Sequence, residues 1–189
     1  MKIAITGGIG CGKSFVCKEL SRHGIEVYDC DDGAKRLMRQ DAGLKRELMR
    51  LVGEDVYDAQ GILQKKVLAS FLLENEANKQ AVNDIVHPAV ARDFERSGKE
   101  WLESAILFDS GFHRRTHFDK VLCVTAPQEV RIRRIMERDG ISREKALEWV
   151  HAQLPQEEVM RRSDFNILND GVEDIAMQVK KLLDKIQTI

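Results

Sequence analysis

The chain has 189 residues, of which 43% are apolar, so it can bury one substantial core and a small inserted subdomain. Its formal net charge is −1, which argues against a general nucleic-acid-binding protein, because that affinity comes mainly from many uncompensated Lys and Arg side chains. No apolar run approaches the ~20 residues that span a bilayer, and because the chain begins in a strand-like run we expect no signal peptide. We therefore expect a cytoplasmic protein that binds neither nucleic acid nor membranes.

Five short apolar runs are typical of strands, and they alternate with stretches in which apolar residues recur every three or four positions, as in amphipathic helices. The runs cover residues 3–6, 25–28, 105–108, 120–126 and 165–168. Alternation of this kind predicts a three-layer α/β fold with a five-stranded, mainly parallel sheet between helices. Ligands of such sheets bind at the carboxyl ends of the strands.

The first run leads directly into the motif G-x-x-x-x-G-K-[ST], with Gly7, Gly12, Lys13 and Ser14 at its fixed positions. The glycines permit a turn whose backbone N–H groups point inward, and the following helix presents its positive N-terminus to the same point. Lys13 can then reach the outer phosphates of a nucleotide, and the Ser14 hydroxyl can hold Mg²⁺. This pattern predicts binding of a nucleoside triphosphate. The residues expected to contact it are Gly8, Ile9, Gly10, Cys11, Gly12, Lys13, Ser14 and Phe15.

Carboxylates follow the second and third runs. Asp29, Asp31 and Asp32 stand together after the second run, where they can hold Mg²⁺ or take a proton from a hydroxyl nucleophile. Because Asp is also a favoured helix cap, one of them can cap the next helix while another reacts. Asp109 closes the third run, as a metal-supporting carboxylate would, although an acidic residue that starts a loop gives the same pattern.

Two further segments have a helical pattern. Residues 34–103 show helical spacing and no convincing strand, which predicts a helical insert beside the nucleotide core. After the fourth run, Arg131, Arg134 and Arg138 share one helical face, where positive charge could stabilise a migrating phosphoryl group. An exposed basic face with surface ion pairs is the alternative. We expect a hinged helical hairpin over residues 134–163 to act as a lid.

The four cysteines are widely spaced and form no C-x-x-C pair, so they indicate neither a zinc site nor a disulfide framework. Cys11 differs from the others because it lies inside the phosphate loop, where a helix N-terminus could lower its pKa and make it oxidisable. Inert packing is the favoured interpretation for all four.

Further elements follow the phosphate loop in a fixed order. They are Asp29-x-Asp31-x-x-Ala34-x-Arg36, His87-Pro88, Leu107-Phe108-Asp109, Arg134-x-x-x-Arg138-Asp139, Gln153, Asp164 and Asn169-x-Gly171. Together with the loop they resemble the ordered signature of dephospho-coenzyme A kinases, from residue 2 to about residue 171. The resemblance implies Mg²⁺- and ATP-dependent phosphorylation of the ribose 3′-hydroxyl of dephospho-coenzyme A, the last step of coenzyme A synthesis. We expect a monomer or a small homo-oligomer.

The resemblance also implies roles for individual residues. Asp31 looks like the base that accepts the ribose hydroxyl proton and, with Ser14, like a ligand of Mg²⁺. Lys13 looks like the residue that stabilises the transferred phosphoryl group, and Arg134 and Arg138 look like lid contacts to the phosphates. The resemblance implies Asn169 and Gly171 near the ATP base, and on the acceptor side Asp29, Asp31, Arg36, Lys65, His87, Pro88 and Asp109. Without the family, the His-Pro pair could equally be a helix start with Pro in its first turn.

A three-part layout follows from the same resemblance. The nucleotide-binding core is expected at residues 1–33, 104–133 and 164–189, the helical acceptor domain at 34–103 and the lid at 134–163.

Four positions depart from the usual family pattern. Ala105 stands where a proline usually opens the segment that ends at Asp109, and Asp109 itself replaces a longer glutamate. Lys65 replaces a common arginine and gives up a bidentate fork, and Val159 replaces a basic residue. The core catalytic set is intact, so we expect an active kinase.

Other functions stay open. Another P-loop kinase for a small molecule or nucleotide would share the fold and differ only in its acceptor pocket. A nucleotide-binding module without turnover is a third interpretation. A regulatory GTPase is disfavoured, because the segment Asn78-Lys79-Gln80-Ala81 lacks the acid that reads guanine.

Overall fold

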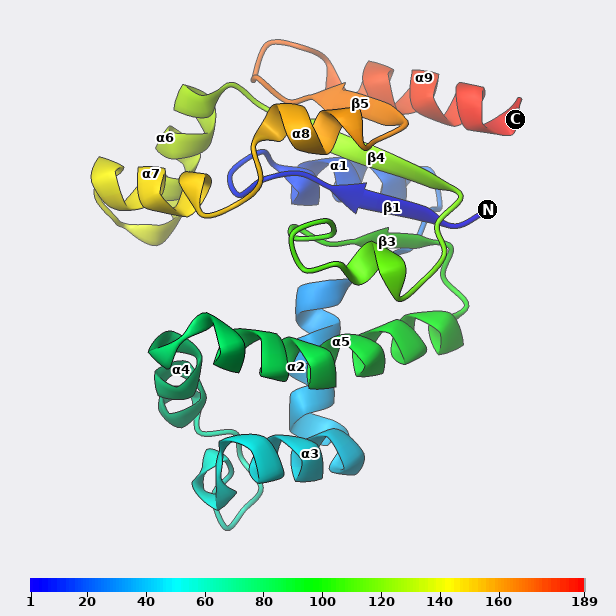
Figure 1. Ribbon diagram of the computed structural model, residues 1–189. Coiled ribbons are helices and arrows are strands. Elements are labelled where there is room, and N and C mark those ends of the chain that lie inside the picture. The colour runs from blue at the N-terminus through cyan, green and yellow to red at the C-terminus, as the bar shows by residue number, and fades with distance from the viewer. Residues whose placement is uncertain (189) are drawn as a thin grey trace. The chain divides into compact units, whose positions relative to one another are not determined.

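The computed structural model describes residues 1–188, so residue 189, the end of the predicted core segment, lies outside the described residues. The chain divides into two compact units (Figure 1). One unit, which we call the sheet unit, comprises Met1–Tyr28 and Lys99–Ile189, and the other, the helical unit, comprises Asp29–Gly98. Within residues 1–188, no helix combines the length and the apolar character that crossing a bilayer requires.

A five-stranded sheet has the strand order β2-β3-β1-β4-β5. The strands are β1 (Ile3–Thr6), β2 (Val27–Asp29), β3 (Trp101–Glu103), β4 (Lys120–Thr125) and β5 (Phe165–Leu168). β1 pairs in parallel with both β3 and β4, and β4 pairs in parallel with β5. The predicted α/β fold with a five-stranded parallel sheet is therefore confirmed.

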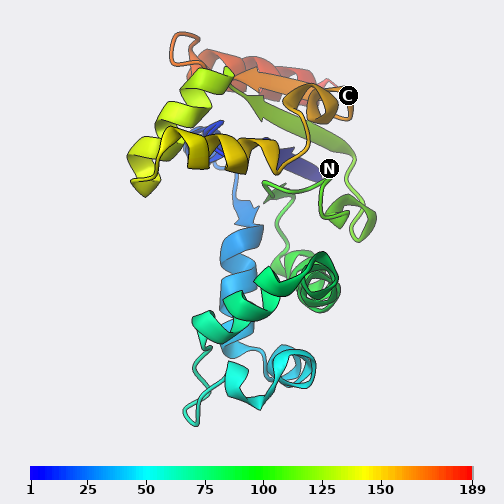
Figure 2. The same ribbon diagram turned by 60° about the vertical axis from the view of Figure 1, so that its left-hand side comes forward.

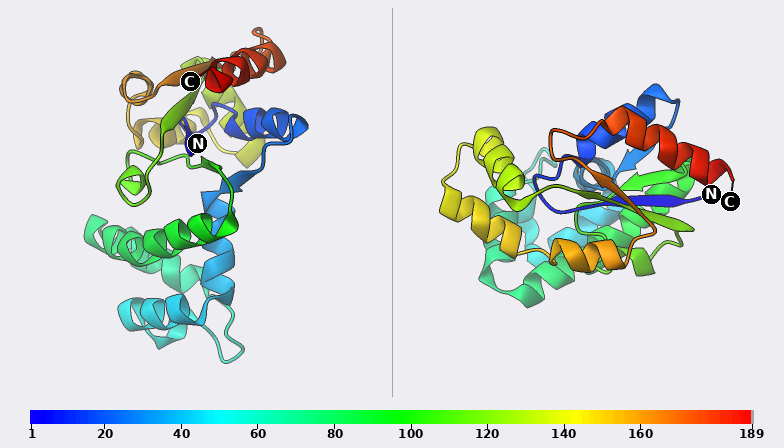
Figure 3. Two further views of the ribbon diagram at one scale, coloured as in Figure 1. Left: turned by 90° about the vertical axis from the view of Figure 1, so that its right-hand side faces the viewer. Right: turned by 90° about the horizontal axis from the view of Figure 1, so that it is seen from above.

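Helices cover both faces of this sheet. They are α1 (Lys13–Arg22), α6 (Gln128–Asp139), α7 (Arg143–His151), α8 (Gln156–Arg161) and α9 (Ile175–Gln187), with the short helix η2 (Phe112–Arg114). The right-hand view of Figure 3 shows α1 and α9 together on one side of the sheet and α8 on the other. The sheet unit thus has the three layers expected from the sequence.

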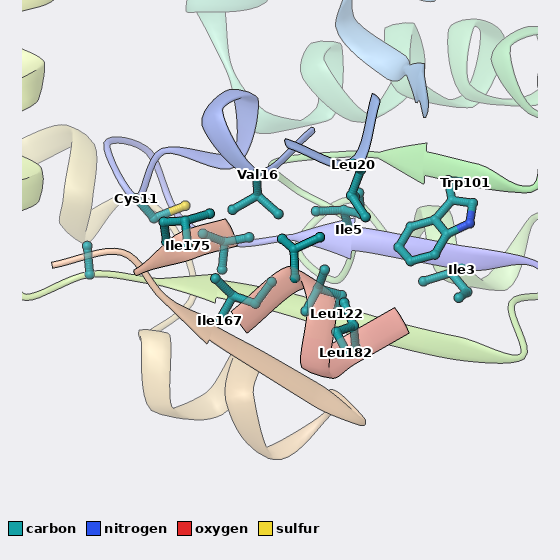
Figure 4. Packing of buried hydrophobic residues seen from close by; sticks show 13 residues of the cluster. Ile3, Ile5, Cys11, Val16, Leu20, Trp101, Leu122, Ile167, Ile175 and Leu182 are labelled. Carbon is teal, nitrogen blue, oxygen red and sulfur yellow. The ribbon is translucent and has the colours of Figure 1, made fainter. Parts of the chain in front are cut away.

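The main core lies between the sheet and the α1–α9 layer (Figure 4). Alternate residues of a strand point to the same face, so Ile3 and Ile5 of β1 pack with Leu20 of α1 and Leu182 of α9. Each fully buried side chain of this size contributes about 1.5–3 kcal/mol relative to exposure. This core holds β1 and α1 rigidly on either side of the loop that connects them.

The third strand is shorter and earlier than predicted, so the prediction of a strand at residues 105–108 is wrong. β3 ends at Glu103, and residues 105–110 form turns in which Ser110 N donates to Ile106 O at 2.9 Å. Leu107 is nonetheless fully buried, which accounts for the apolar run without a strand. The helical stretch likewise does not continue to residue 103, since β3 lies within it.

The helical unit contains α2 (Cys30–Gln40), α3 (Ala42–Val52), η1 (Glu54–Val56), α4 (Lys65–Glu74) and α5 (Glu76–Ser97). The long helix α5 packs against α2, α3 and α4 (Figure 2). Three helices begin at a capping side chain, because Asp29, Asp41 and Asn75 each accept a backbone N–H from the first turn. Pro88 lies inside α5, so the alternative interpretation of His87-Pro88 as a helix start is wrong.

Candidate active site

The loop between β1 and α1 is a tight turn of glycines. Gly7, Gly10 and Gly12 have φ values of 143°, 79° and 85°, a region that residues with a side chain rarely adopt. A Cβ atom on Gly12 would also lie 2.1 Å from the Asn169 Nδ2 atom. The strand, glycine loop and helix therefore stand in the arrangement that cradles phosphate groups.

Lys13 reaches back across this loop. Its Nζ atom donates to Gly7 O at 2.9 Å and lies 3.5 Å from Glu103 Oε1. Glu103 is the last residue of β3, opposite Ile5 of β1 in parallel register. Glu103 therefore lies at the carboxyl end of the strand beside the phosphate loop. Its negative charge can balance the positive charge of Lys13, and its carboxylate can support a metal ion.

The connection between α7 and α8 is bound to the same loop. Gln153 Oε1 accepts a hydrogen bond from Ile9 N at 2.7 Å. One residue further on, Leu154 N donates to Asp109 Oδ1 at 2.7 Å. This connection is therefore fixed on one side to the phosphate loop and on the other to the turns that follow β3.

Arg134 and Asn169 clamp the far end of the loop. Arg134 Nη1 donates to Asn169 O at 3.0 Å and to the carbonyls of Gly10 and Cys11 at 3.4 Å, while Nη2 donates to Asn169 Oδ1 at 3.2 Å. Asn169 Nδ2 donates to Cys11 O at 3.0 Å. These bonds join α6, the end of β5 and the phosphate loop.

A pocket of about 520 Å³ opens beside this clamp. Its lining includes Gly12, Phe15, Arg134, Asn169 and Gly171, and the Phe15 side chain is 58% exposed there. Pockets of a few hundred Å³ accommodate ligands of nucleoside size. The structure therefore brings together the residues predicted near the nucleotide base.

The comparisons with known proteins agree with this geometry. A model of the dephospho-CoA kinase family matches residues 1–174. The chain belongs to the dephospho-CoA kinase family. It is 38% identical to a dephospho-CoA kinase of Bacteroides fragilis over 97% of this chain and 91% of that protein. A dephospho-CoA kinase of Chlorobaculum tepidum is 34% identical over 99% and 95% of the two chains.

Solved structures include a similar protein, TT1252 from Thermus thermophilus. Its TM-score is 0.82 at 32% identity, over 98% of this chain and 97% of that chain. The resemblance to the dephospho-CoA kinase family, predicted from the order of motifs, is confirmed.

The acceptor-side residues predicted from the dephospho-CoA kinase family lie mostly in the helical unit. Asp29 caps α2 by accepting Asp32 N at 2.9 Å, which leaves Asp31 exposed in the first turn. Arg36 of α2 forms an ion pair with Asp93 of α5. Lys65 is the exposed first residue of α4, and His87 and Pro88 lie in the middle of α5. Their part in the reaction stays a prediction.

Two predicted residues of the sheet unit lie in unexpected surroundings. Arg138 directs its guanidinium to the neighbouring Asp139 at 2.7 Å, and its side chain is 60% exposed. Asp109 does not close a strand, because residues 105–110 form turns, and its carboxylate instead accepts a hydrogen bond from Leu154 N. The contacts of Arg138 to the phosphates and of Asp109 to the acceptor stay predictions.

Glu103 is the site residue that the sequence analysis missed. The pattern of an apolar segment closed by an acid is present at Trp101-Leu102-Glu103, six residues before Asp109, for which the sequence predicts it. Its apolar part is only two residues long, and the run that ends at Phe108 is longer. The strand signal at residues 101–103 is therefore weaker than that of the apolar run at residues 105–108, which forms a buried turn.

All four cysteines lie within residues 1–188, and none of them forms a disulfide. Cys11 is fully buried, and burial raises the pKa of its thiol, so the prediction that the helix N-terminus could lower that pKa is wrong. Inert packing of Cys11 is the interpretation that its burial supports.

Proposed function

We propose that this chain transfers the γ-phosphoryl group of ATP to the ribose 3′-hydroxyl of dephospho-coenzyme A. The bond between the γ-phosphorus and the bridging oxygen of ADP breaks, a bond from the 3′-oxygen forms, and the hydroxyl proton goes to a base on the protein. The observation that carries this proposal is the phosphate loop with Lys13 held between Gly7 O and Glu103, in a member of the dephospho-CoA kinase family.

The residues of the loop fit a bound triphosphate. A Cβ atom on Gly7, Gly10 or Gly12 would lie within 3 Å of a neighbouring atom, so the loop can turn this tightly only with glycine, and it leads into the positive N-terminus of α1. Ser14 in the first turn of α1 and the carboxylate of Glu103, both in the sheet unit, would hold Mg²⁺. When bound, that ion supplies compensation of the negative charge on the phosphates.

Each of the chain's own groups has one task in this proposal. Lys13 stabilises charge on the transferred phosphoryl group, and Arg134, which lines the pocket, lies beside the nucleotide. Asp31 accepts the proton of the 3′-hydroxyl, a role open to it because Asp29 supplies the helix cap. Arg36 and Lys65 of the helical unit offer positive charge to the pyrophosphate of the acceptor.

A coupled assay of ADP release tests the proposal. Mg²⁺-ATP is supplied with dephospho-coenzyme A, adenosine, AMP or no acceptor, and the products are weighed by mass spectrometry. We expect one added phosphate on dephospho-coenzyme A alone. Phosphate on a different acceptor would reassign the chain to another P-loop kinase activity. ATP binding without any phosphorylated product would favour a non-catalytic module.

A further inference from the structure

Arg131 is the most buried of the arginines on α6. Only 5% of its surface is exposed, whereas Arg133, two residues on, is exposed. Removing a guanidinium from water is costly unless hydrogen bonds and an opposite charge replace its hydration. The position of Arg131 therefore calls for a compensating partner.

The protein supplies only part of that compensation. Arg131 Nε donates to Ile9 O in the phosphate loop at 2.9 Å. Among the residues that the structure describes, none forms an ion pair with Arg131. Burial lowers the pKa of Arg131 and the charge of Glu157 raises it, but the Glu157 side chain is exposed to solvent. A guanidinium nevertheless stays protonated in proteins. A buried positive charge thus rests against the loop without an ion-pair partner among residues 1–188.

The guanidinium lies directly on the loop backbone. A Cβ atom on Gly8 would be 2.2 Å from Arg131 Nη2 and 2.8 Å from Cζ. Gly8 does not have a positive φ, so a side chain there would meet the guanidinium and would not be opposed by the backbone conformation. A Cβ atom on Gly10 would likewise lie 2.7 Å from Arg131 O. The first turns of α6 therefore contact the phosphate loop closely, through the Arg131 guanidinium at Gly8 and through the Arg131 backbone at Gly10.

We propose that Arg131 is a positioning residue of the phosphate site, whose guanidinium fixes the Gly8 and Ile9 segment and whose buried charge is compensated by bound polyphosphate. The inference rests on the proposed function only in that the loop binds a nucleoside triphosphate. A fixed cation against a cradle of inward N–H groups adds to the positive potential there. Its effect on binding should therefore grow with the number of phosphates in the ligand.

The test is a ladder of ligands on the full chain. Calorimetry gives the dissociation constants of Mg²⁺-ATP, Mg²⁺-ADP and AMP for the unaltered protein and for Arg131→Gln, which can still donate a hydrogen bond but has no charge. We expect about a tenfold or greater loss of ATP affinity, a smaller loss for ADP and little change for AMP. Arg131→Lys, which retains the charge, should recover most of the difference between ATP and AMP.

Arg133→Gln is the matched control, because it removes an exposed charge from the same helix and should change none of the three constants. Equal losses of affinity for all three ligands, with no recovery of affinity in Arg131→Lys, would overturn the inference. They would show that Arg131 only holds the loop in place and that its charge has no effect on the phosphates. Unchanged affinities in Arg131→Gln would overturn it as well. Thermal unfolding without ligand checks that each variant folds, and Arg131→Met is the second neutral variant if the glutamine does not.

No acceptor is present in these titrations, so their outcome is separate from the phosphoryl transfer. The loss of affinity in Arg131→Gln could grow from AMP to ATP in a protein that does not phosphorylate dephospho-coenzyme A. That result would contradict the proposed function and leave the role of Arg131 intact. The converse result would leave the kinase assignment and remove Arg131 from the phosphate site.

Discussion

The side-chain oxygen of Gln153 accepts the backbone N–H of Ile9 at 2.7 Å, across 144 positions of sequence. The bond attaches the connection between α7 and α8 to the phosphate loop. Because the backbone N–H groups of such loops are the groups that hold phosphates, the side chain at position 153 has influence over nucleotide binding.

A charge at position 153 tests that influence. Gln153→Glu places a carboxylate beside Ile9 N, and like charge near the phosphates should raise the dissociation constant of ATP about tenfold, as measured by calorimetry. Gln128→Glu adds the same charge at the exposed start of α6 and should leave the constant unchanged. Equal constants for Gln153→Glu and the control would show that the side chain at position 153 does not influence nucleotide binding.

Glu103 should matter for turnover more than for nucleotide affinity. Glu103→Gln removes the charge opposite Lys13 while keeping the shape of the side chain, and we expect kcat to fall by about 10²-fold. The Mg²⁺ concentration for half-maximal rate should rise. Steady-state kinetics across a Mg²⁺ series measure both quantities. Glu100→Gln, whose side chain is 64% exposed, is the control, and a Glu103→Gln enzyme with ordinary kcat and Mg²⁺ dependence would remove Glu103 from the site.

The three aspartates after β2 should have separable roles. Asp31→Asn is expected to lower kcat by about 10²- to 10⁴-fold, the usual worth of a general base, with ATP affinity retained. Asp32→Asn is the neighbouring control, since Asp32 is exposed and its carboxylate makes only a surface pair with Lys35 at 3.5 Å. Similar activity in the two variants would show that Asp31 is not the base.

Gly8 and Arg131 should be coupled in stability. Gly8→Ala forces a methyl group into the guanidinium, and overpacking of this kind costs about 1–3 kcal/mol. Arg131→Ala creates room, so the double variant should lose less stability than the two single losses added together. Urea denaturation of the four proteins gives the coupling energy. If the stability losses of the two single variants add up to that of the double variant, Gly8 and Arg131 are not coupled, and the loop accommodates the methyl group without strain.

Buried thiols should make the protein less stable in alkali. Burial raises the pKa of Cys123 from 9.0 to about 12. Below pH 9 the Cys123 thiol is protonated in the folded protein and in the unfolded chain. Between pH 9 and about 12 it ionises only in the unfolded chain, and the free energy of unfolding therefore falls by up to about 1.4 kcal/mol per pH unit.

Cys123→Ala removes this dependence. The stability difference between the unaltered protein and the variant should be constant from pH 7 to 8 and shrink toward pH 11, as followed by urea denaturation. A difference that stays constant over the whole range would show that the folded thiol ionises as readily as the unfolded one.

Much of the sheet unit could be predicted from local pattern. The motif from Gly7 to Ser14 combines a strand, a glycine turn and a helix within a few residues, so its geometry depends little on the rest of the chain. In the helical unit, the cap of α2 at Asp29 is equally local, because the carboxylate accepts an N–H three residues away. Predictions of this kind hold when the interacting groups are neighbours in sequence.

Predictions failed where distant partners decide the structure. β3 is a strand because Trp101 and Leu102 pair with Ile3 and Ala4 of β1, and the local signal of two apolar residues and an acid is too short to predict that pairing. Leu107 is buried just as fully in a turn, so apolar character alone cannot separate the two. Gln153 and Arg131 were likewise invisible as loop contacts, because each reaches Ile9 from more than a hundred residues away.

Ile9 has both of its backbone groups held by side chains, its N–H by Gln153 and its C=O by Arg131. A hydrogen-bonded amide exchanges with deuterium only when the bond opens. The exchange rate of the Ile9 amide therefore reports how readily the α7–α8 connection separates from the phosphate loop. Deuterium uptake of a peptide that covers Ile9, followed by mass spectrometry, reports that event and needs neither substrate nor substitution.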